Sequence, residues 1–513
     1  MFIMHPFRYA AGGYQPAGAL MFDGSADYLH RSPGSTTGNK KFTFSCWLKR
    51  AKLSTSSTIF SAWTNDTNRS AIHIEDNGFL DLLSDVGGSR HSDLHTTSTY
   101  LDPTSWFNLI LVYDSTVSTP SGSSIFFMIN GTKVVEGGYG ELDAHVYPSQ
   151  NQVTQWLTSG TQMAIGMNNY GDTPILFYSG YMADAILLDG TASTNGSEFG
   201  EADEDTGIWV PKDPSDLTFG TNGFWLDFAL AQGSGNGPGN DVSGNDNDFT
   251  NVSFTAAQTT TDSPTNTSSD DRGNYATFNP LAPTSDITFS LGNTKVVNAS
   301  TNAHRLAPST LGVSGGKWYW EYTVDAIGTA EMMLGVSPAE GHSLTSYVGN
   351  PADGFAYVGG GTKYNSASSA SYGATFTTGD IIGVALDLDN GNIFFSKDGA
   401  WQNSATTGEI AAGTDTNAAY TTLSATNTYL PSWSSYGGSG SATINTGQTA
   451  FSYTPPTGFK KVNTSHFAEV SKPADFYNTV LWTGDGVAIG SGGQTITGVG
   501  FQPDFIYVKQ RNS

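Results

Sequence analysis

The stretch GDIIGVALDLDNGNIFFSKDGAW, residues 379–401, decides the fold of the chain's second half. One alternating set in its first part is apolar throughout: Ile382, Val384, Leu386 and Leu388. This period of two is typical of a half-buried β-strand. The DNG sequence at 389–391 tolerates the positive φ angles of a tight hairpin, and a second alternating strand follows at 392–397. The stretch carries no nucleophile and no metal-ligand cluster, so it predicts a rigid antiparallel scaffold.

The same alternation recurs in short runs along the whole chain. Between residues 19 and 255, such runs are separated by turn residues, as in a β-sandwich. The chain has 61 glycines in 513 residues and an aromatic fraction of 12%, which suits many tight turns around aromatic cores. We therefore predict an all-β fold class: tandem antiparallel β-sandwiches, first a jelly roll and then a bent sandwich, with a short N-terminal arm.

Shifts in composition divide the chain into five segments. They are an N-terminal arm (1–18), a first sandwich (19–255), a polar linker (256–273), a second sandwich (274–463) and the start of a further β module (464–513). The last segment has few large apolar residues and is too small to form a stable core alone. We expect that it is truncated or that it completes a core elsewhere.

The charge and cysteine content exclude several classes of function. The net charge is −24, from 22 basic and 46 acidic residues, and such a surface repels nucleic acid and anionic lipid. No run approaches the roughly 18 apolar residues of a membrane helix, and we expect no signal peptide at the N-terminus. The single cysteine, Cys46, excludes an intrachain disulfide and a cysteine-based metal cluster, and we expect it to be buried.

The first sandwich carries five motifs in a fixed order. They are F-D-G-x-x-D-Y-L, F-T-F-S-x-W-L-K, W-F-N-L-I-L-V-Y-D, I-N-G-T-K-V and Y-S-G-Y-M-A-D. In this order they resemble a laminin-G-like, concanavalin A-type jelly roll. That family includes lectins, adhesive modules and glycosidases, so the resemblance implies the fold rather than one function.

The opening stretch belongs to a second set of motifs. G-K-W-Y-W-E, L-G-V-S, G-D-I-I-G-V-A-L-D and I-F-F-S-K-D-G-x-W follow one another and resemble a SPRY domain. The resemblance implies a bent β-sandwich whose loops bind a protein partner, without catalytic machinery. Near the end, W-T-G-D-G and I-T-G-V-G-F-x-P-D-F-I-Y-V-K resemble a module of bacteriophage tail and appendage proteins.

Carboxylates and histidines offer little catalytic chemistry. Glu201, Asp203 and Asp205 alternate as the carboxylates of a retaining glycosidase on a strand would, but neighbouring glycines and the lack of β-branched residues predict an acidic turn. His91 and His95 have a spacing that gathers metal ligands only on a helix, and their surroundings predict turn and strand. We expect no enzyme.

One polar loop is a candidate calcium site. Asp241, Asn245, Asn247 and Asp248 offer hard oxygen ligands around a glycine turn. The loop lacks the distal bidentate glutamate of an EF-hand, and Asx-Gly runs are also ordinary turn chemistry. Calcium therefore stays an alternative to a purely structural turn, and no other cofactor is required.

Aromatic residues in polar surroundings are the candidate recognition sites. Tyr170, Tyr347, Tyr364 and Tyr436 lie in polar loops, where a sugar ring stacks on an aromatic face or where the side chain packs locally. Phe2, Phe7, Tyr9 and Tyr14 belong to an arm that either docks on a larger assembly or is a flexible lead-in.

Together these features predict a structural and adhesive component of a bacteriophage particle, such as a tail fibre, spike or capsid fibre. Its arm would bind other virion proteins, and its loops would bind a host-surface glycan or protein from the particle exterior. A homotrimer is what fibres usually form. We expect no binding to nucleic acid and no membrane insertion. The alternatives are a polysaccharide depolymerase on the jelly roll and an intracellular SPRY-type scaffold.

Overall fold

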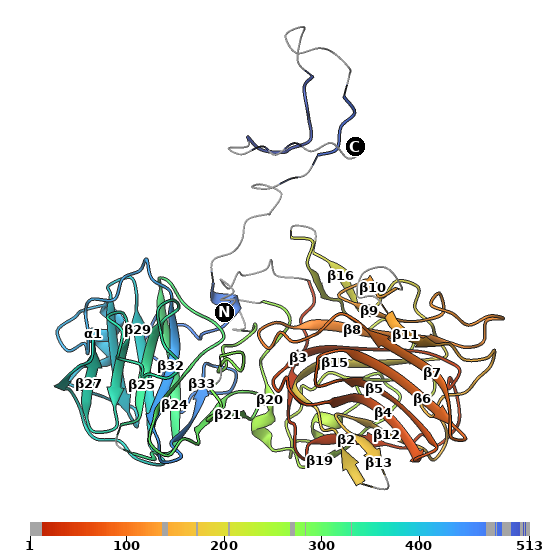
Figure 1. Ribbon diagram of the computed structural model, residues 1–513, viewed down its shortest axis with the longest axis horizontal. Coiled ribbons are helices and arrows are strands. Elements are labelled where there is room, and N and C mark those ends of the chain that lie inside the picture. Colours follow the sequence, from red (N-terminus) through yellow and green to blue (C-terminus); the bar gives the residue numbers. More distant parts are fainter. Residues whose placement is uncertain are drawn as a thin grey trace.

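The computed structural model contains two antiparallel β-sandwiches that lie side by side (Figure 1). It describes residues 13–135, 142–170, 173–203, 206–266, 272–282, 284–329 and 331–467, and a few positions between 478 and 508. Strands dominate this part of the chain, which confirms the predicted fold class. No helix among the described residues is long and apolar enough to cross a membrane.

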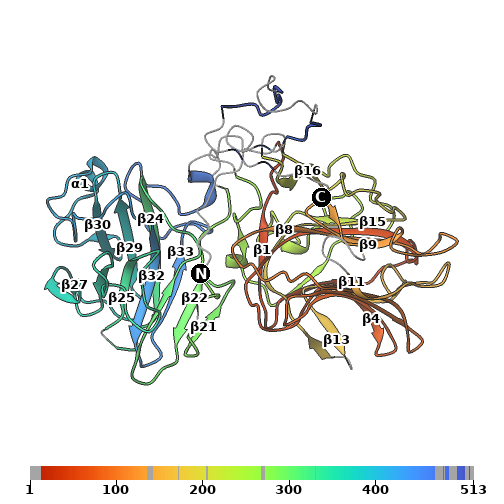
Figure 2. The same ribbon diagram turned by 45° about the horizontal axis from the view of Figure 1, so that its top comes forward.

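The first sandwich consists of two eight-stranded sheets (Figures 1 and 2). One has the order β10-β9-β8-β3-β15-β1-β20, with β18 paired to β15. Its strands are β1 (Ala19–Asp23), β3 (Lys41–Arg50), β8 (Phe107–Asp114), β9 (Ile125–Ile129), β10 (Thr132–Lys133), β15 (Ser179–Asp189), β18 (Phe224–Leu226) and β20 (Thr259–Thr260). The other has the order β11-β7-β6-β5-β4-β12-β2-β19. Its strands are β2 (Tyr28–Arg31), β4 (Ser57–Asn65), β5 (Asn68–Ile74), β6 (Leu80–Val86), β7 (Ser89–Thr96), β11 (Leu142–Val146), β12 (Gln162–Ile165) and β19 (Thr250–Val252).

The alternating apolar residues of both sheets meet in one core. Phe44 stacks on Phe60 across the two sheets, with ring centroids 4.5 Å apart. Cys46 is buried in this core, as predicted. Two small hairpins lie outside the sheets: β13 (Asn168–Tyr170) with β14 (Thr173–Ile175), and β16 (Gly200–Ala202) with β17 (Trp209–Pro211).

The second sandwich consists of a seven-stranded and a six-stranded sheet. The seven-stranded sheet contains β21 (Ile287–Ser290), β22 (Lys295–Asn298), β33 (Ser441–Asn445), β24 (Lys317–Ala326), β29 (Ile381–Asp387), β30 (Asn392–Lys397) and β31 (Ala400–Trp401), in that order. The six-stranded sheet contains β23 (His304–Pro308), β32 (Tyr429–Tyr436), β25 (Met333–Pro338), β26 (Phe355–Val358), β27 (Thr362–Asn365) and β28 (Ser368–Ser371). One short helix, α1 (Thr407–Ala412), follows β31.

The stretch 379–401 forms the predicted hairpin, β29 and β30, within the seven-stranded sheet. Gly391 turns the chain with a φ of 74°. Gly383 is required for a steric reason. A Cβ at this position would lie 2.4 Å from Ser396 Oγ and 2.7 Å from the hydroxyl of Tyr319. The glycine therefore makes room for the buried Tyr319, whose hydroxyl donates to Glu321 at 2.9 Å.

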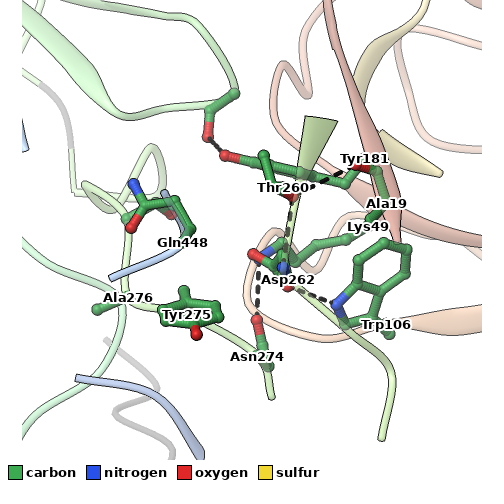
Figure 3. A network of polar contacts seen from close by, with 12 residues as sticks. Ala19, Lys49, Trp106, Tyr181, Thr260, Asp262, Asn274, Tyr275, Ala276 and Gln448 are labelled. Carbon is green, nitrogen blue, oxygen red and sulfur yellow. Dashed lines mark hydrogen bonds and ion pairs between the residues drawn. The ribbon is translucent and has the colours of Figure 1, made fainter. Parts of the chain in front are cut away.

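A buried polar network joins the sandwiches, and it includes Asp262 from the predicted linker (Figure 3). The Lys49 ammonium on β3 pairs with the carboxylate of Asp262 and donates to Asn274 Oδ1 at 2.9 Å. Trp106 Nε1 donates to the other oxygen of Asp262 at 2.8 Å. Because β20 pairs with β1 and Asp262 is buried, the described part of the predicted linker packs on the folded body.

Backbone groups add further contacts between the sandwiches. The hydroxyl of Tyr181 donates to Gly292 O at 3.0 Å, and Asn293 Nδ2 donates to Ala51 O at 3.0 Å.

Phe2, Phe7 and Tyr9 of the predicted docking arm lie outside the described residues.

Tyr14 of the predicted arm packs on the first sandwich. Its hydroxyl donates to Asp184 Oδ1 at 3.2 Å, and Trp225 Nε1 donates to the same oxygen at 2.8 Å. Asp184 sits at a bulge in β15 with a φ of 44°, and burial raises its pKa to about 7. Between about pH 4 and pH 7 the folded chain therefore holds a proton on Asp184 that the unfolded chain has released.

We expect Asp184→Asn to be more stable than the parent chain above pH 7. A carboxyl whose pKa is raised by folding stabilises fully below its unfolded pKa, and this contribution is lost as pH rises through about 7, by up to about 4 kcal/mol. Asparagine keeps the acceptor oxygen and tolerates the left-handed backbone. Urea unfolding at pH 4.5 and pH 8 measures the difference, and the gain should be several times larger at pH 8. The exposed Asp216→Asn is the control, and an equal gain at both pH values would contradict the prediction.

Candidate functional site

A row of five side chains crosses the outer face of the sheet that contains β4. Successive neighbours on β12, β4, β5, β6 and β7 form it: Gln162, Trp63, Arg69, Asp85 and Arg90. The adjacent positions Ala62 and Met163 point into the core. Because side chains alternate along a strand, the five point away from it. The strand registers therefore place these five side chains side by side on the outer surface of this sheet.

A cavity of about 400 Å³ opens at the Gln162 end of the row. It is lined by Tyr28, Trp63, Thr64, Gly160, Gln162, Met167, Asn169 and Pro174. The hairpin of β13 and β14 supplies one wall, and Figure 1 shows it at the edge of the sheet beside β12 and β2. Two aromatic rings and two amide side chains therefore face one volume, in which the lining carries no charged side chain.

The polar groups of the cavity are only partly satisfied. Asn169 Nδ2 donates to Gln162 Oε1 at 2.7 Å. Asn169 is 8% exposed, yet its Oδ1 has no hydrogen-bond partner among the described residues, and neither has Trp63 Nε1. A buried polar atom without a partner costs about 1–3 kcal/mol. Both atoms are buried, so a hydroxyl-bearing ligand or a water could bond to them only after a side-chain shift.

The backbone beside the cavity is strained. Leu176, two residues after Pro174, has a φ of 52°, which is uncommon for a leucine. Gly166, before Met167, has a φ of 88°, and a Cβ there would lie 2.5 Å from the ring of Phe22. Glycine adopts this angle without strain, so Leu176 is the strained position, and such residues cluster at binding sites.

Tyr170 is the predicted recognition residue that lies next to this cavity. It follows Asn169 on β13 and is 54% exposed. Its ring centroid is 5.8 Å from Cζ of Arg69, so a guanidinium rather than the cavity itself lies under the ring.

The other three predicted tyrosines meet on the second sandwich around His304. The ring of His304 is 4.7 Å from that of Tyr347 and 4.9 Å from that of Tyr436. Tyr364 contacts Tyr347 edge to face at 5.5 Å. We call these four residues the tyrosine cluster. Its members come from β23, β27, β32 and the loop after β25. The sequence did not predict that these segments meet.

The tyrosine cluster offers aromatic faces and acceptor groups. Burial lowers the pKa of His304, so the ring is neutral at pH 7 although Glu331 Oε2 is 3.7 Å from its Nε2. His304 Nδ1 is buried without a partner in the described part of the chain. Tyr347 and Tyr364 also pack on the apolar side chains of Leu306 and Met333, which fixes the loop to the sheet.

The residues of the candidate calcium loop bond mainly to the backbone. Asp241 accepts from the backbone N–H of Trp225, Ser243 and Asn247, and Asp248 accepts from the N–H of Asp241. Asn245 and Asn247 both donate to Gly223 O. Within the described ranges, no three His, Cys, Asp or Glu side chains are placed to hold a metal ion. Calcium binding stays a prediction.

Carboxylates show one arrangement that sequence reasoning missed. Asp81 on β6 lies between His73 on β5 and His95 on β7, on the same outer face as the row. Burial raises the pKa of Asp81 to about 7, and the neighbouring Asp93 adds to the rise. Of the acidic residues considered from the sequence, Glu201 lies on β16 and Asp203 accepts from Thr206 N at 2.7 Å in the turn that follows. Asp205 lies outside the described residues.

Three family models match separate parts of the chain. The concanavalin A-like lectin/glucanases superfamily matches residues 23–189, and the SPRY domain matches residues 317–434. A domain of unknown function (DUF7483) matches residues 472–513. The chain therefore contains a laminin-G-like, concanavalin A-like domain and a SPRY domain, as its motifs predicted.

Individual relatives share limited parts of the chain. The ATP-dependent RNA helicase DDX1 of Xenopus laevis is 36% identical over 91 residues, which are 18% of this chain and 12% of the helicase. The SPRY domain of human HERC1 aligns with a TM-score of 0.28 and 19% identity, over 34% of this chain and 99% of that one. A SAP-like pentraxin from Limulus polyphemus aligns with a TM-score of 0.25 and 14% identity, over 35% of this chain and 78% of that one. These likenesses say nothing about function.

Proposed function

We propose that the chain is an adhesive binding protein whose first sandwich binds a glycan in the cavity between Trp63 and Tyr28. The observation that carries the proposal is the lining itself: two aromatic rings with two amide side chains, one of which has a buried acceptor without a partner. Sugar rings present an apolar face that packs on aromatic rings and hydroxyl groups that bond to amides. The lectin-like family of this domain supports the same class of ligand.

The test is a glycan array probed with the labelled full chain, followed by calorimetry on the glycans that bind. Trp63 points away from the core, so Trp63→Ala should fold normally while its affinity falls about tenfold or more. Trp401→Ala is the matched control, because Trp401 is a partly buried tryptophan of the second sandwich. Unchanged affinity in Trp63→Ala, or no glycan bound by the parent chain, would overturn the proposal.

A second candidate function is protein binding at the tyrosine cluster. It is supported by the convergence of three loop tyrosines around His304 on a SPRY domain. This function would give a soluble protein partner in pull-downs that Tyr347→Ala loses. It is compatible with glycan binding, since the two sites lie on different sandwiches.

The biological setting that we propose is the exterior of a bacteriophage particle, with the chain as a fibre or spike component. The final segment's sequence resemblance, the acidic surface and the pairing of two binding domains support it. A homotrimer would add avidity to weak single contacts. Mass spectrometry of purified particles tests this setting. If the chain is not detected in the particles, the setting is contradicted.

We propose binding without catalysis. The alternative, a polysaccharide depolymerase, can be tested at one pair of carboxyl groups. Asp81, with its pKa raised to about 7, would be the acid, and Asp93 the carboxylate. New reducing ends released from host glycans by the parent chain but not by Asp81→Asn would establish that alternative.

A further inference from the structure

Arg69 lies on the outer face of the first sandwich, next to the cavity residue Trp63. It is the direct cross-strand neighbour of Trp63, which places the two Cβ atoms about 5 Å apart. Its Nε donates to Asp85 Oδ2 at 2.9 Å, and the ring of Tyr170 lies 5.8 Å from its Cζ. One edge and one face of the guanidinium are therefore held in place by the protein.

The two terminal nitrogens of the same guanidinium, Nη1 and Nη2, make no hydrogen bond to the described residues. The side chain of Arg69 is 24% exposed. Arg90 differs, since its Nε donates to Asp85 Oδ1 at 2.6 Å and its Nη1 to Asp93 Oδ2 at 2.9 Å. Arg69 thus combines fixed geometry with free donors at the border of the cavity.

We infer that the cavity and Arg69 together select an acidic glycan, in which the ring of a carboxylated sugar packs near Trp63 and its carboxylate accepts from Nη1 and Nη2 of Arg69. The inference rests on the proposed glycan binding. The planar guanidinium fork matches a carboxylate in geometry, and a charged hydrogen bond is stronger than a neutral one.

The charges around Arg69 are compatible with such a ligand. Asp85 is shared by two guanidinium groups, and these pairs lower its pKa against the effect of burial. The chain's net charge of −24 repels an anion at long range, but salt screens this repulsion beyond about 8 Å at physiological ionic strength. The selectivity therefore has to come from the contact at Arg69.

The experiment compares matched pairs of glycans with the full chain: uronic- and sialic-acid-containing oligosaccharides, each beside its carboxyl-reduced counterpart. We expect the carboxylated member of at least one pair to bind about tenfold to a hundredfold more tightly. Arg69→Gln should bring that member to the level of its neutral counterpart. Arg69→Lys should lose most of the preference, because lysine keeps the charge without the fork.

Arg90→Gln is the matched control, and it should keep the preference because Arg69 still pairs with Asp85. Arg69→Gln should fold, since Arg90 still pairs with the same carboxylate. Equal affinity for the two members of every pair, or equal losses for both in Arg69→Gln, would overturn the inference while glycan binding stands. No binding to any glycan would overturn the proposed function as well.

Discussion

Replacing Lys49 with methionine is expected to lower the free energy of unfolding by about 3–5 kcal/mol. The side chains of Lys49 and Asp262 are 2% and 1% exposed, so the substitution leaves a carboxylate buried without its charged partner. Trp106 and Asn274 belong to the same network, and Asn274 lies in the second sandwich (Figure 3). The loss should therefore weaken the contact between the two sandwiches as well as the first sandwich itself.

Urea unfolding at pH 7 measures this effect, and Lys41→Met is the control. Lys41 pairs with Asp114 at 3.4 Å, but its side chain is 40% exposed, so its removal should cost less than about 1 kcal/mol. Burial already raises the pKa of Asp262. In Lys49→Met the carboxyl can take up a proton in the folded state, so the loss should be smaller at pH 4.5 than at pH 7. A cost below 1 kcal/mol at pH 7 would contradict the role of the buried pair.

Gly335→Ala should destabilise the second sandwich by about 3 kcal/mol. Gly335 belongs to the L-G-V-S motif on β25, which is paired on both sides, to β26 and β32. A Cβ at this position would lie 2.0 Å from the backbone oxygen of Phe355. A backbone atom within a ladder cannot move aside without breaking the hydrogen bonds of that ladder, so the strain cannot be relieved locally.

Calorimetry of the full chain measures the loss as a lower melting temperature of the second sandwich. Gly408→Ala is the control, because Gly408 lies in α1 with open space around it and alanine favours a helix. We expect that variant to be as stable as the parent chain or slightly more stable. Equal melting temperatures for the two variants would contradict the steric account of Gly335.

The local features of the fold could be predicted because they depend on neighbours in sequence. The alternation and the DNG turn at 379–401 define β29 and β30, and the motif order identified both domains. The tertiary contacts of the linker could not be predicted, because its polar composition gives no sign that any of its residues is buried. Asp262 looks like a solvated residue in the sequence, and only the position of Lys49 in the fold makes its burial favourable.

The site could be predicted only in part for the same reason. Tyr170 and the three tyrosines of the second sandwich were candidates as single loop residues, but their neighbours come from distant segments. Trp63, Arg69 and Gln162 face one surface because β4 pairs with both β5 and β12, and this register is not encoded near any one of them. A tryptophan in an alternating strand is also ordinarily a core residue, so Trp63 gave no signal of its own.

A crystal structure of the full chain with its tightest-binding oligosaccharide tests the central claim most directly. The account predicts a sugar ring in the cavity, packed on Trp63 and within hydrogen-bond distance of the amides of Gln162 and Asn169. A sugar bound at the tyrosine cluster or elsewhere, with the Trp63 cavity empty, would contradict it.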